Sequence, residues 1–221
     1  MNGKILVTGC SGLVGTHTAN KLVEKGYEVV GVDIKTSEFL PKKNFEFILM
    51  DLRDADDVSV LFDQFKFDGV INSFGIKGSP IRVQTKPIEY LEPSIKVNVN
   101  IIDNCVKHDC WLVYMSSVGV YEPAEVFFED TVWSTFPSKK DWYGGWSKRI
   151  PELYLEAYKV QEAYDKYTIV RPANIFGEYD NFGEGSTAIA STVRKVFEAT
   201  DEIVSWGDGS PTRDFIYGGD V

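Results

Sequence analysis

The stretch Gly9-Cys10-Ser11-Gly12-Leu13-Val14-Gly15 decides the fold, because it links a predicted strand to a predicted helix. The strand is the apolar run Lys4–Thr8, and the helix is expected to continue to about Lys25. The G-x-x-G-x-x-G spacing allows a tight turn, and a pyrophosphate can approach a backbone that carries no Cβ. The first turn of the helix then supplies free N–H donors and the positive end of the helix dipole. The stretch therefore predicts a phosphate-binding turn, with a purely structural turn as the alternative.

The second predicted strand, Glu28–Asp33, ends in a carboxylate eighteen residues after Gly15. A carboxylate at this position accepts hydrogen bonds from the ribose hydroxyls of a dinucleotide and repels a 2′-phosphate. Lys35 lies nearby and is a small argument against that repulsion. On balance the pattern favours NAD over NADP, so NAD is the expected cofactor.

Apolar runs of strand length alternate with helix-length segments through the rest of the chain. The further strands expected are Phe45–Met50, Phe67–Phe74, Trp111–Ser116 and Tyr167–Arg171. The further helices expected lie near residues 58–65, 94–107, 148–165 and 188–199. This rhythm predicts an α/β fold, a Rossmann-type doubly wound parallel sheet with helices on both faces. We expect an NAD-binding domain at residues 1–172 and a small, partial substrate-binding lobe at residues 173–221, interleaved with it.

The composition is that of a globular protein: 221 residues, 43% of them hydrophobic, with a formal net charge of −10. The basic residues are scattered, which argues against nucleic acid as a partner, and no apolar run is long enough for a membrane span. Cys10, Cys105 and Cys110 lack the spacing of a disulfide framework or a metal site. His17 and His108 lie outside the motifs, so no metal is expected. The chain leads straight into a strand, without room for a signal peptide, and we expect a cytoplasmic location.

Several further segments resemble motifs of one protein family, in the same order along the chain. They are Asp51–Asp54, Val97–Asn100, Ser116–Tyr121, Arg171–Gly177, Trp206–Gly209 and Arg213–Tyr217. Together with Thr8–Gly15 they resemble the extended short-chain dehydrogenase/reductases, the NAD-dependent epimerase/dehydratases. The resemblance covers nearly the whole chain, and its C-terminal part, with Tyr179-Asp180-Asn181-Phe182, is most similar to the GDP-fucose synthases.

The resemblance implies an enzyme that acts on a UDP- or GDP-linked sugar by transient hydride transfer at a sugar carbon. In the family a tyrosinate takes the hydroxyl proton, and a nearby lysine ammonium lowers the pKa of that tyrosine. The resemblance assigns this lysine role to Lys148, and to Ser117 the contact with the substrate hydroxyl. A serine at the end of a strand also commonly caps local backbone, and that is the alternative for Ser117.

The tyrosine of this site departs from the family pattern Tyr-x-x-x-Lys. The residue four before Lys148 is Gly144, and the nearest tyrosine, Tyr143, is five before it. In an α-helix, five residues turn Tyr143 about 140° away from Lys148. Three alternatives are open: a π-bulge eased by Gly144-Gly145 restores the contact, Tyr143 reaches the site from a loop before the helix, or the tyrosine is lost. We name Tyr143 as the candidate catalytic residue beside Ser117 and Lys148.

The resemblance also implies which residues hold the two ligands. Those expected at NAD are Gly9, Ser11, Gly12, Leu13, Val14, Gly15, Asp33, Ile34, Asp51, Leu52, Ser73, Phe74, Gly75, Asn98, Lys148 and Pro172. Those expected at the nucleotide sugar are Ser117, Asn174, Arg194, Trp206 and Arg213. Arginine suits a diphosphate and tryptophan covers a base or a sugar, whereas surface arginines and a core tryptophan are the plain alternative.

Missing acid–base residues narrow the expected reaction. Related dehydratases carry an acidic pair where this chain has Val118 and Gly119, and GDP-fucose synthases carry a cysteine at Gly119 and a histidine at Thr187. Dehydration and double epimerisation are therefore disfavoured, which leaves simple 4-epimerisation or carbonyl reduction. The altered tyrosine spacing keeps a second class open, a non-catalytic relative that binds NAD in a structural or sensory role.

The family also implies a homodimer, formed through the helices near residues 94–107 and 148–165. The final residues, Arg213–Val221, resemble a segment after which relatives continue through much of their substrate lobe. We therefore expect a complete NAD-binding domain with a partial lobe, which retains NAD and binds sugar nucleotides weakly.

Overall fold

The computed structural model describes residues 2–76, 80–183, 186–204, 207–210 and 212–221. Its main feature is a six-stranded parallel sheet with the strand order β3-β2-β1-β4-β5-β6. The strands are β1 (Lys4–Thr8), β2 (Glu28–Asp33), β3 (Phe45–Leu49), β4 (Gly69–Asn72), β5 (Trp111–Met115) and β6 (Tyr167–Val170). Each lies within its predicted segment, and the order confirms the Rossmann-type doubly wound sheet.

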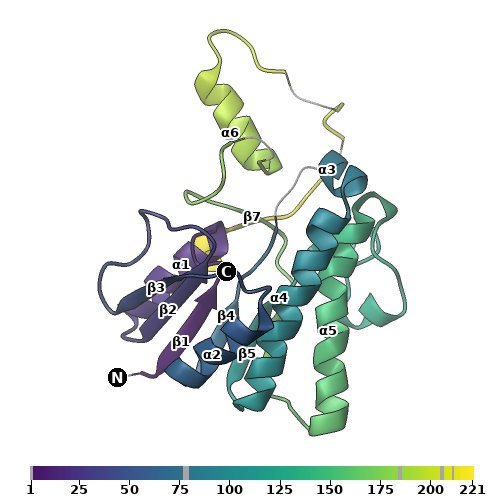
Figure 1. The fold of residues 1–221 in the computed structure, drawn as a ribbon. Coiled ribbons are helices and arrows are strands. Elements are labelled where there is room, and N and C mark those ends of the chain that lie inside the picture. The colour runs from purple at the N-terminus through teal and green to yellow at the C-terminus, as the bar shows by residue number, and fades with distance from the viewer. Residues whose placement is uncertain (1, 77–79, 184–185, 205–206, 211) are drawn as a thin grey trace.

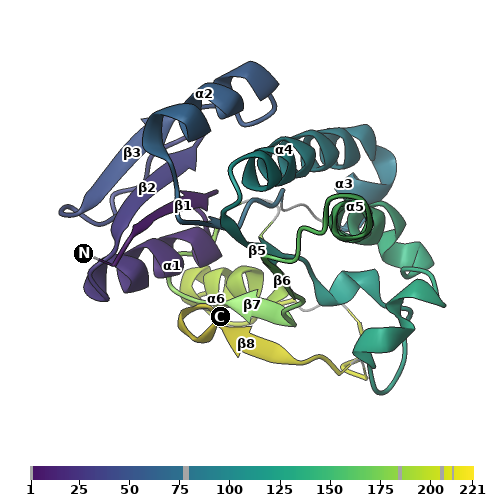
Figure 2. The ribbon, with the colours of Figure 1, turned by 90° about the horizontal axis from the view of Figure 1, so that it is seen from below.

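Helices cover both faces of this sheet (Figure 2). The described helices are α1 (Leu13–Glu24), α2 (Ala55–Phe65), α3 (Pro80–Thr85), α4 (Ile88–Lys107), α5 (Trp142–Glu162) and α6 (Ala188–Glu198). Short 3-10 helices are η1 (Val118–Val120), η2 (Glu129–Trp133), η3 (Lys139–Asp141) and η4 (Gly218–Asp220). On one face α2, α4 and α5 pack in a row, and α1 lies on the other face (Figure 2). Both faces are therefore buried, as is usual for a parallel sheet.

Alternation along the central strand explains the two layers. Leu6 and Val7 on β1 are both fully buried, and they belong to different cores. Leu6 shares its core with Phe62 of α2 and Ile101 of α4, whereas Val7 shares its core with Ala19 of α1. Successive side chains of a strand point to opposite faces, so a continuous apolar run serves both layers.

Two helices begin six residues before their predicted starts. α4 begins at Ile88 and contains Pro93, which the sequence suggests as a start signal. α5 begins at Trp142, whereas the sequence predicts that this helix begins near residue 148. In each case tertiary packing supports the additional turns, because Tyr90 is buried in α4 and Gly145 is buried in α5.

Beyond residue 172 the chain leaves the main sheet. β7 (Asn174–Phe176) and β8 (Phe215–Tyr217) pair as a separate two-stranded parallel sheet, which the sequence does not predict. His17 of α1 packs against Tyr179 and Tyr217 at ring-centroid distances of 4.6 and 5.4 Å, which places the later segment against this helix. α6 stands above the carboxyl edge of the main sheet (Figure 1). The division into two domains at residue 172 stays a prediction.

Candidate active site

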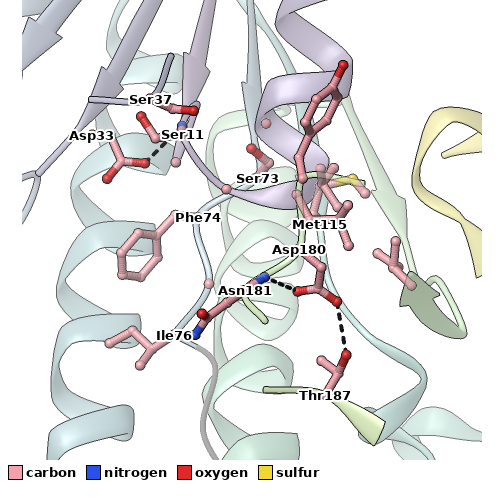
Figure 3. Close-up of a pocket in the computed structure, with 18 of the residues that line it drawn as sticks. Ser11, Asp33, Ser37, Ser73, Phe74, Ile76, Met115, Asp180, Asn181 and Thr187 are labelled. Carbon is pink, nitrogen blue, oxygen red and sulfur yellow. Dashed lines mark hydrogen bonds between the residues drawn. The ribbon is translucent and has the colours of Figure 1, made fainter. Parts of the chain in front are cut away.

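A cleft of about 1330 Å³ opens along the carboxyl edge of the main sheet. Its walls come from the turn after β1, the ends of β2, β4 and β5, and the segment that follows β7 (Figure 3). In open parallel sheets ligands bind outside the carboxyl ends of the strands, where the winding direction changes. The cleft is therefore the place where a phosphate-binding turn and catalytic residues can meet.

The turn at residues 9–15, called the phosphate turn below, brings backbone close to the cleft. Gly9 has a φ of +62°, and its N–H donates to Val32 O at 2.9 Å. A Cβ on Gly15 would lie 2.1 Å from Gly9 O, so only glycine lets α1 start so close to the turn. Among the described residues no side chain caps α1 at Gly12, and the first turn has no acidic residue. The first N–H groups of α1 are thus available to an anion such as a diphosphate.

Asp33 closes one end of the phosphate turn. Its Oδ2 accepts a hydrogen bond from Ser11 N at 3.1 Å (Figure 3), and its Oδ1 accepts one from Lys35 N at 3.4 Å. Ser11 Oγ donates to Lys35 O at 2.7 Å, which ties the loop after β2 to the turn. These contacts fix the Asp33 carboxylate beside the phosphate turn, at the place where the sequence predicts the ribose contact.

Almost all residues expected at NAD line this cleft. They are Gly9, Ser11, Gly12, Leu13, Val14, Gly15, Asp33, Ile34, Asp51, Leu52, Ser73, Phe74, Gly75, Lys148 and Pro172. The exception is Asn98, which is fully buried. Its Oδ1 accepts a hydrogen bond from Asn72 Nδ2 at 2.8 Å, and its Nδ2 donates to Ser94 O at 2.7 Å. Asn98 therefore supports the end of β4 from behind, as a positioning residue.

Lys148 and Ser117 lie at the other end of the cleft. Lys148 Nζ donates to Phe74 O at 2.9 Å and to Met115 O at 2.8 Å, so it joins the ends of β4 and β5. Burial lowers the pKa of the Lys148 ammonium to about 8. Ser117 lines the cleft, and its Oγ accepts a hydrogen bond from Gly119 N at 3.1 Å. Ser117 therefore caps local backbone and at the same time belongs to the wall of the cleft.

Tyr143 does not join this end of the cleft. α5 is α-helical from Trp142 to Glu162, so neither a π-bulge nor a loop brings Tyr143 beside Lys148, and both of those predictions are wrong. The five-residue spacing turns the two side chains about 140° apart. Tyr143 is 37% exposed and is not among the described residues that line the cleft. Loss of the tyrosine from the site is the alternative that agrees with this placement.

The predicted substrate residues are brought together only in part. Asn174 lines the cleft, and its Nδ2 donates to Asp214 O at 3.0 Å. Arg194 on α6 and Arg213 before β8 are not among the cleft-lining residues in the described part of the chain. Trp206 lies outside the described residues. The structure therefore does not bring either arginine to the cleft.

Sequence reasoning missed a polar pair that lines the cleft after β7. Asp180 Oδ2 accepts a hydrogen bond from Thr187 Oγ1 at 2.9 Å, and Asp180 Oδ1 accepts one from Asn181 N at 2.7 Å (Figure 3). Phe74 and Ile76, on the segment after β4, add apolar surface to the same cleft (Figure 3). Asp180 lies in the Tyr179–Phe182 segment that resembles the GDP-fucose synthases, and Thr187 stands where those enzymes carry a histidine. The contact between the two could not be predicted, because they are seven residues apart in irregular chain.

A buried ion pair supports the Lys148 end of the cleft from behind. Glu152 on α5 is fully buried, and its two carboxylate oxygens accept hydrogen bonds from Arg171 Nε at 3.0 Å and Arg171 Nη2 at 2.8 Å. Ser116 Oγ also donates to the Glu152 carboxylate. The pair fixes α5, and with it Lys148, against the ends of β5 and β6.

A profile of the NAD dependent epimerase/dehydratase family matches residues 5–221 of the chain. The chain belongs to the NAD-dependent epimerase/dehydratase family. The family and the fold class predicted from the sequence are thereby confirmed, and NAD, the predicted cofactor, is the one that the family's description names.

Two curated members of the family show the range of its relatives. The chain is 27% identical over 239 residues to a UDP-glucose 4-epimerase of Pisum sativum, covering 96% of this chain and 65% of the relative. It is also 27% identical over 229 residues to GDP-L-fucose synthase 1 of Arabidopsis thaliana, covering 100% of this chain and 67% of the relative. The chain thus spans about two-thirds of the length of these curated relatives.

The crystal structure of a UDP-glucose 4-epimerase of Thermotoga maritima with UDP-glucose has the same fold. Its TM-score to this epimerase/dehydratase family member is 0.84 at 26% identity, covering 98% of this chain and 70% of the other. In the described ranges no helix is long and apolar enough to cross a membrane. Among the same residues, no group of three or more His, Cys, Asp or Glu side chains could hold a metal ion.

Proposed function

We propose that the chain binds NAD in the cleft and acts on a UDP- or GDP-linked sugar by hydride transfer at a sugar carbon, as a 4-epimerase or a carbonyl reductase. The observation that carries the proposal is one cleft with Asp33 and the phosphate turn at one end and Lys148 with Ser117 at the other. A bound NAD supplies the acceptor and donor for a hydride from a sugar carbon.

The residues of the cleft fit a dinucleotide. A Cβ on Gly12 would lie 3.3 Å from Gly9 O, so glycine keeps the backbone open at the start of α1, where a diphosphate would bind. Asp33 would accept hydrogen bonds from the adenosine ribose. Lys148 has three N–H donors and uses two on carbonyl oxygens, which leaves one for a ribose hydroxyl of the cofactor.

The names of the relatives support a nucleotide sugar as the substrate. The polar atoms of Asp180, Asn181 and Thr187 line the cleft and could bind sugar hydroxyls. We assign to Ser117 Oγ a hydrogen bond to the reacting sugar hydroxyl. Val118 and Gly119 carry no group that transfers a proton, so the proposal is limited to reactions without a second acid–base pair.

A second candidate function is a relative that binds NAD without catalysis. The position of Tyr143 outside the cleft favours it, because the tyrosine that takes the substrate proton in the family is then absent from the site. The two functions share the NAD site and differ in whether bound NAD is reduced when a nucleotide sugar is added.

Calorimetric titration with NAD, followed by a panel of UDP- and GDP-sugars, tests the proposal. We expect NAD to bind, NADH absorbance or fluorescence to appear with one activated sugar, and chromatography to show the epimerised or reduced product. NAD binding without any redox change supports the non-catalytic relative. Absence of NAD binding contradicts both functions.

We also propose a homodimer that forms through α4 and α5. Leu153 and Val160 on α5 are 53% and 88% exposed. They are seven residues apart, so they lie on the same face of the helix. A cytoplasmic location stays a prediction, and the three buried free cysteines, Cys10, Cys105 and Cys110, agree with a reducing compartment.

A further inference from the structure

Two of the three cysteines meet at the end of α4, away from the cleft. Cys105 lies in the last turn of α4, and Cys110 directly precedes β5. Cys105 is fully buried and Cys110 is 4% exposed, and both belong to the core between α4 and the main sheet. Because β5 reaches the cleft at its other end, with Met115, the two thiols lie at the opposite edge of the sheet.

The turn that ends α4 brings the two cysteines together. Asp109 has a φ of +53°, in the left-handed region, and its N–H donates to Val106 O at 3.1 Å. Cys110 N donates to Cys105 O, also at 3.1 Å. These two bonds form a Schellman motif, in which the side chains of the residues joined by the longer bond frequently contact each other. This backbone contact places the two Cα atoms within the range of about 4.4–6.8 Å that a disulfide bridges.

The two thiols differ in reactivity. The hydrogen bond that the Cys105 thiol donates lowers the pKa of the Cys110 thiol below its ordinary value. Burial raises the pKa of the Cys105 thiol above that value. Because the thiolate is the nucleophile, Cys110 reacts first with an oxidant, and Cys105 is the neighbour that can displace the oxidised group.

We propose that Cys105 and Cys110 form a reversible disulfide when the chain meets hydrogen peroxide, and that the dithiol is the resting form. The Cys110 sulfur attacks one peroxide oxygen, the O–O bond breaks, and Cys110 becomes a sulfenic acid as one water leaves. The Cys105 sulfur then attacks the sulfenic sulfur and loses its proton, and a second water leaves as the S–S bond forms. Both sulfurs are oxidised, and the peroxide is reduced to two waters.

The place of the pair in the fold favours this reaction. Cys110 lies in a turn at a helix end, and such ends open at a small fraction of the free energy of global unfolding, so a molecule little larger than water can reach the thiol. The S–S bond replaces a contact that already exists, so β5 keeps its place in the sheet. Cys10, by contrast, has no second cysteine in its core cluster, and burial raises its pKa to about 12.

Peptide mapping of the peroxide-treated full chain tests the proposal. We expect a small molar excess of hydrogen peroxide to remove the mass of two hydrogen atoms and to join the tryptic peptides of Cys105 and Cys110, which Lys107 separates. The number of thiols that a maleimide labels after denaturation should fall from three to one, and dithiothreitol should restore all three. The matched control Cys10→Ser should still form the link.

Two further variants separate the steps. Cys105→Ser should stop at the Cys110 sulfenic acid, which dimedone traps, and in Cys110→Ser the Cys105 thiol should stay reduced. Three labelled thiols in the treated wild-type protein, a link that includes Cys10, or a link between two copies on a non-reducing gel overturns the proposal. Neither the reaction nor its test involves a nucleotide, so such a result leaves the proposed function as it stands.

Discussion

Asp33 brings a negative charge to the edge of the phosphate turn, where the backbone N–H groups of Ser11 and Lys35 hold it. Asp33→Asn keeps one acceptor oxygen and removes the charge. We expect the ratio of NADP to NAD affinity to rise roughly tenfold, equivalent to about 1.4 kcal/mol, because the 2′-phosphate is no longer repelled. Calorimetric titration with each dinucleotide measures the ratio. Asp56→Asn, at an exposed position on α2, controls for net charge, and an unchanged ratio in Asp33→Asn contradicts the ribose contact.

Lys148 makes stability depend on pH. Its pKa in the folded chain is about 8, below the ordinary 10.5, because burial disfavours the ammonium. The unfolded chain therefore binds the proton more tightly, and the free energy of unfolding rises as the pH increases from about 8 to about 10.5. The expected rise is about 3 kcal/mol, at about 1.4 kcal/mol per pKa unit. Urea unfolding at a series of pH values should show this rise in the wild-type protein but not in Lys148→Met, whereas equal rises contradict it.

At the scale of elements, α5 carries a buried cation without a hydrogen-bonding partner. Arg149 is 1% exposed, and Nε, Nη1 and Nη2 have no hydrogen-bond partner among the described residues. The rings of Trp133 and Trp146 lie 5.4 Å from its guanidinium carbon. We expect Arg149→Met to raise the free energy of unfolding by about 1–3 kcal/mol, because it removes an unpaired buried charge. Urea denaturation measures the change.

Glu152→Met is the contrasting variant on the same helix. It removes the carboxylate that Arg171 and Ser116 contact, so it leaves the Arg171 charge unpaired. We expect the free energy of unfolding to fall by about 3–5 kcal/mol. A loss of similar size in Arg149→Met would show that Arg149 stabilises the element, against the expectation.

The start of α5 shows why local patterns predict only part of the structure. Each glycine disfavours a helix by about 1 kcal/mol, so the pair Gly144-Gly145 indicates a start after it. In the folded chain a Cβ on Gly145 would lie 2.4 Å from Pro137 Cβ and 2.5 Å from Gly119 O. Glycine is needed there for a close approach that is not local in sequence.

Local sequence patterns predict the strands of the main sheet but not those of the small sheet. The phosphate turn and β1 to β6 could be predicted, because each is a continuous apolar run or a glycine pattern within a few residues. β7 and β8 have three residues each, and Asn174 pairs with Phe215 across about forty residues of chain. Such short pairings are fixed by tertiary contacts, which a local pattern does not contain.

At the scale of the whole molecule, the two ends of the cleft are unequally supplied with positive charge. Among its described lining residues the cationic side chains are Lys35, Arg53 and Lys148, all before residue 173. Arg194 and Arg213 lie away from it. We therefore expect UDP-glucose to bind at least tenfold more weakly than NAD, because no arginine from the later segment holds its diphosphate. Calorimetric titration of NAD, and then of UDP-glucose into the NAD-loaded protein, measures the two affinities, and a UDP-glucose affinity within tenfold of that of NAD contradicts it.

The surface of the whole molecule also predicts that two copies of the chain form a dimer. Leu153 and Val160 place exposed apolar side chains on the outer side of α5, which packs along α4 on the same face of the sheet (Figure 2). In a C2 dimer the same patch meets itself, so a charge added there is added twice and faces its own copy. With a formal net charge of −10, added glutamates also increase repulsion between copies.

We therefore expect light scattering after size-exclusion chromatography to give the mass of a dimer for the wild-type protein and of a monomer for the double variant Leu153→Glu, Val160→Glu. The matched control is Val193→Glu, Phe197→Glu on α6, where the side chains are 50% and 91% exposed and lie outside the proposed interface. The control should remain dimeric, because only the α5 patch lies at the contact. A dimeric α5 variant places the interface elsewhere on the molecule, and a monomeric control contradicts a contact that is limited to the α5 patch.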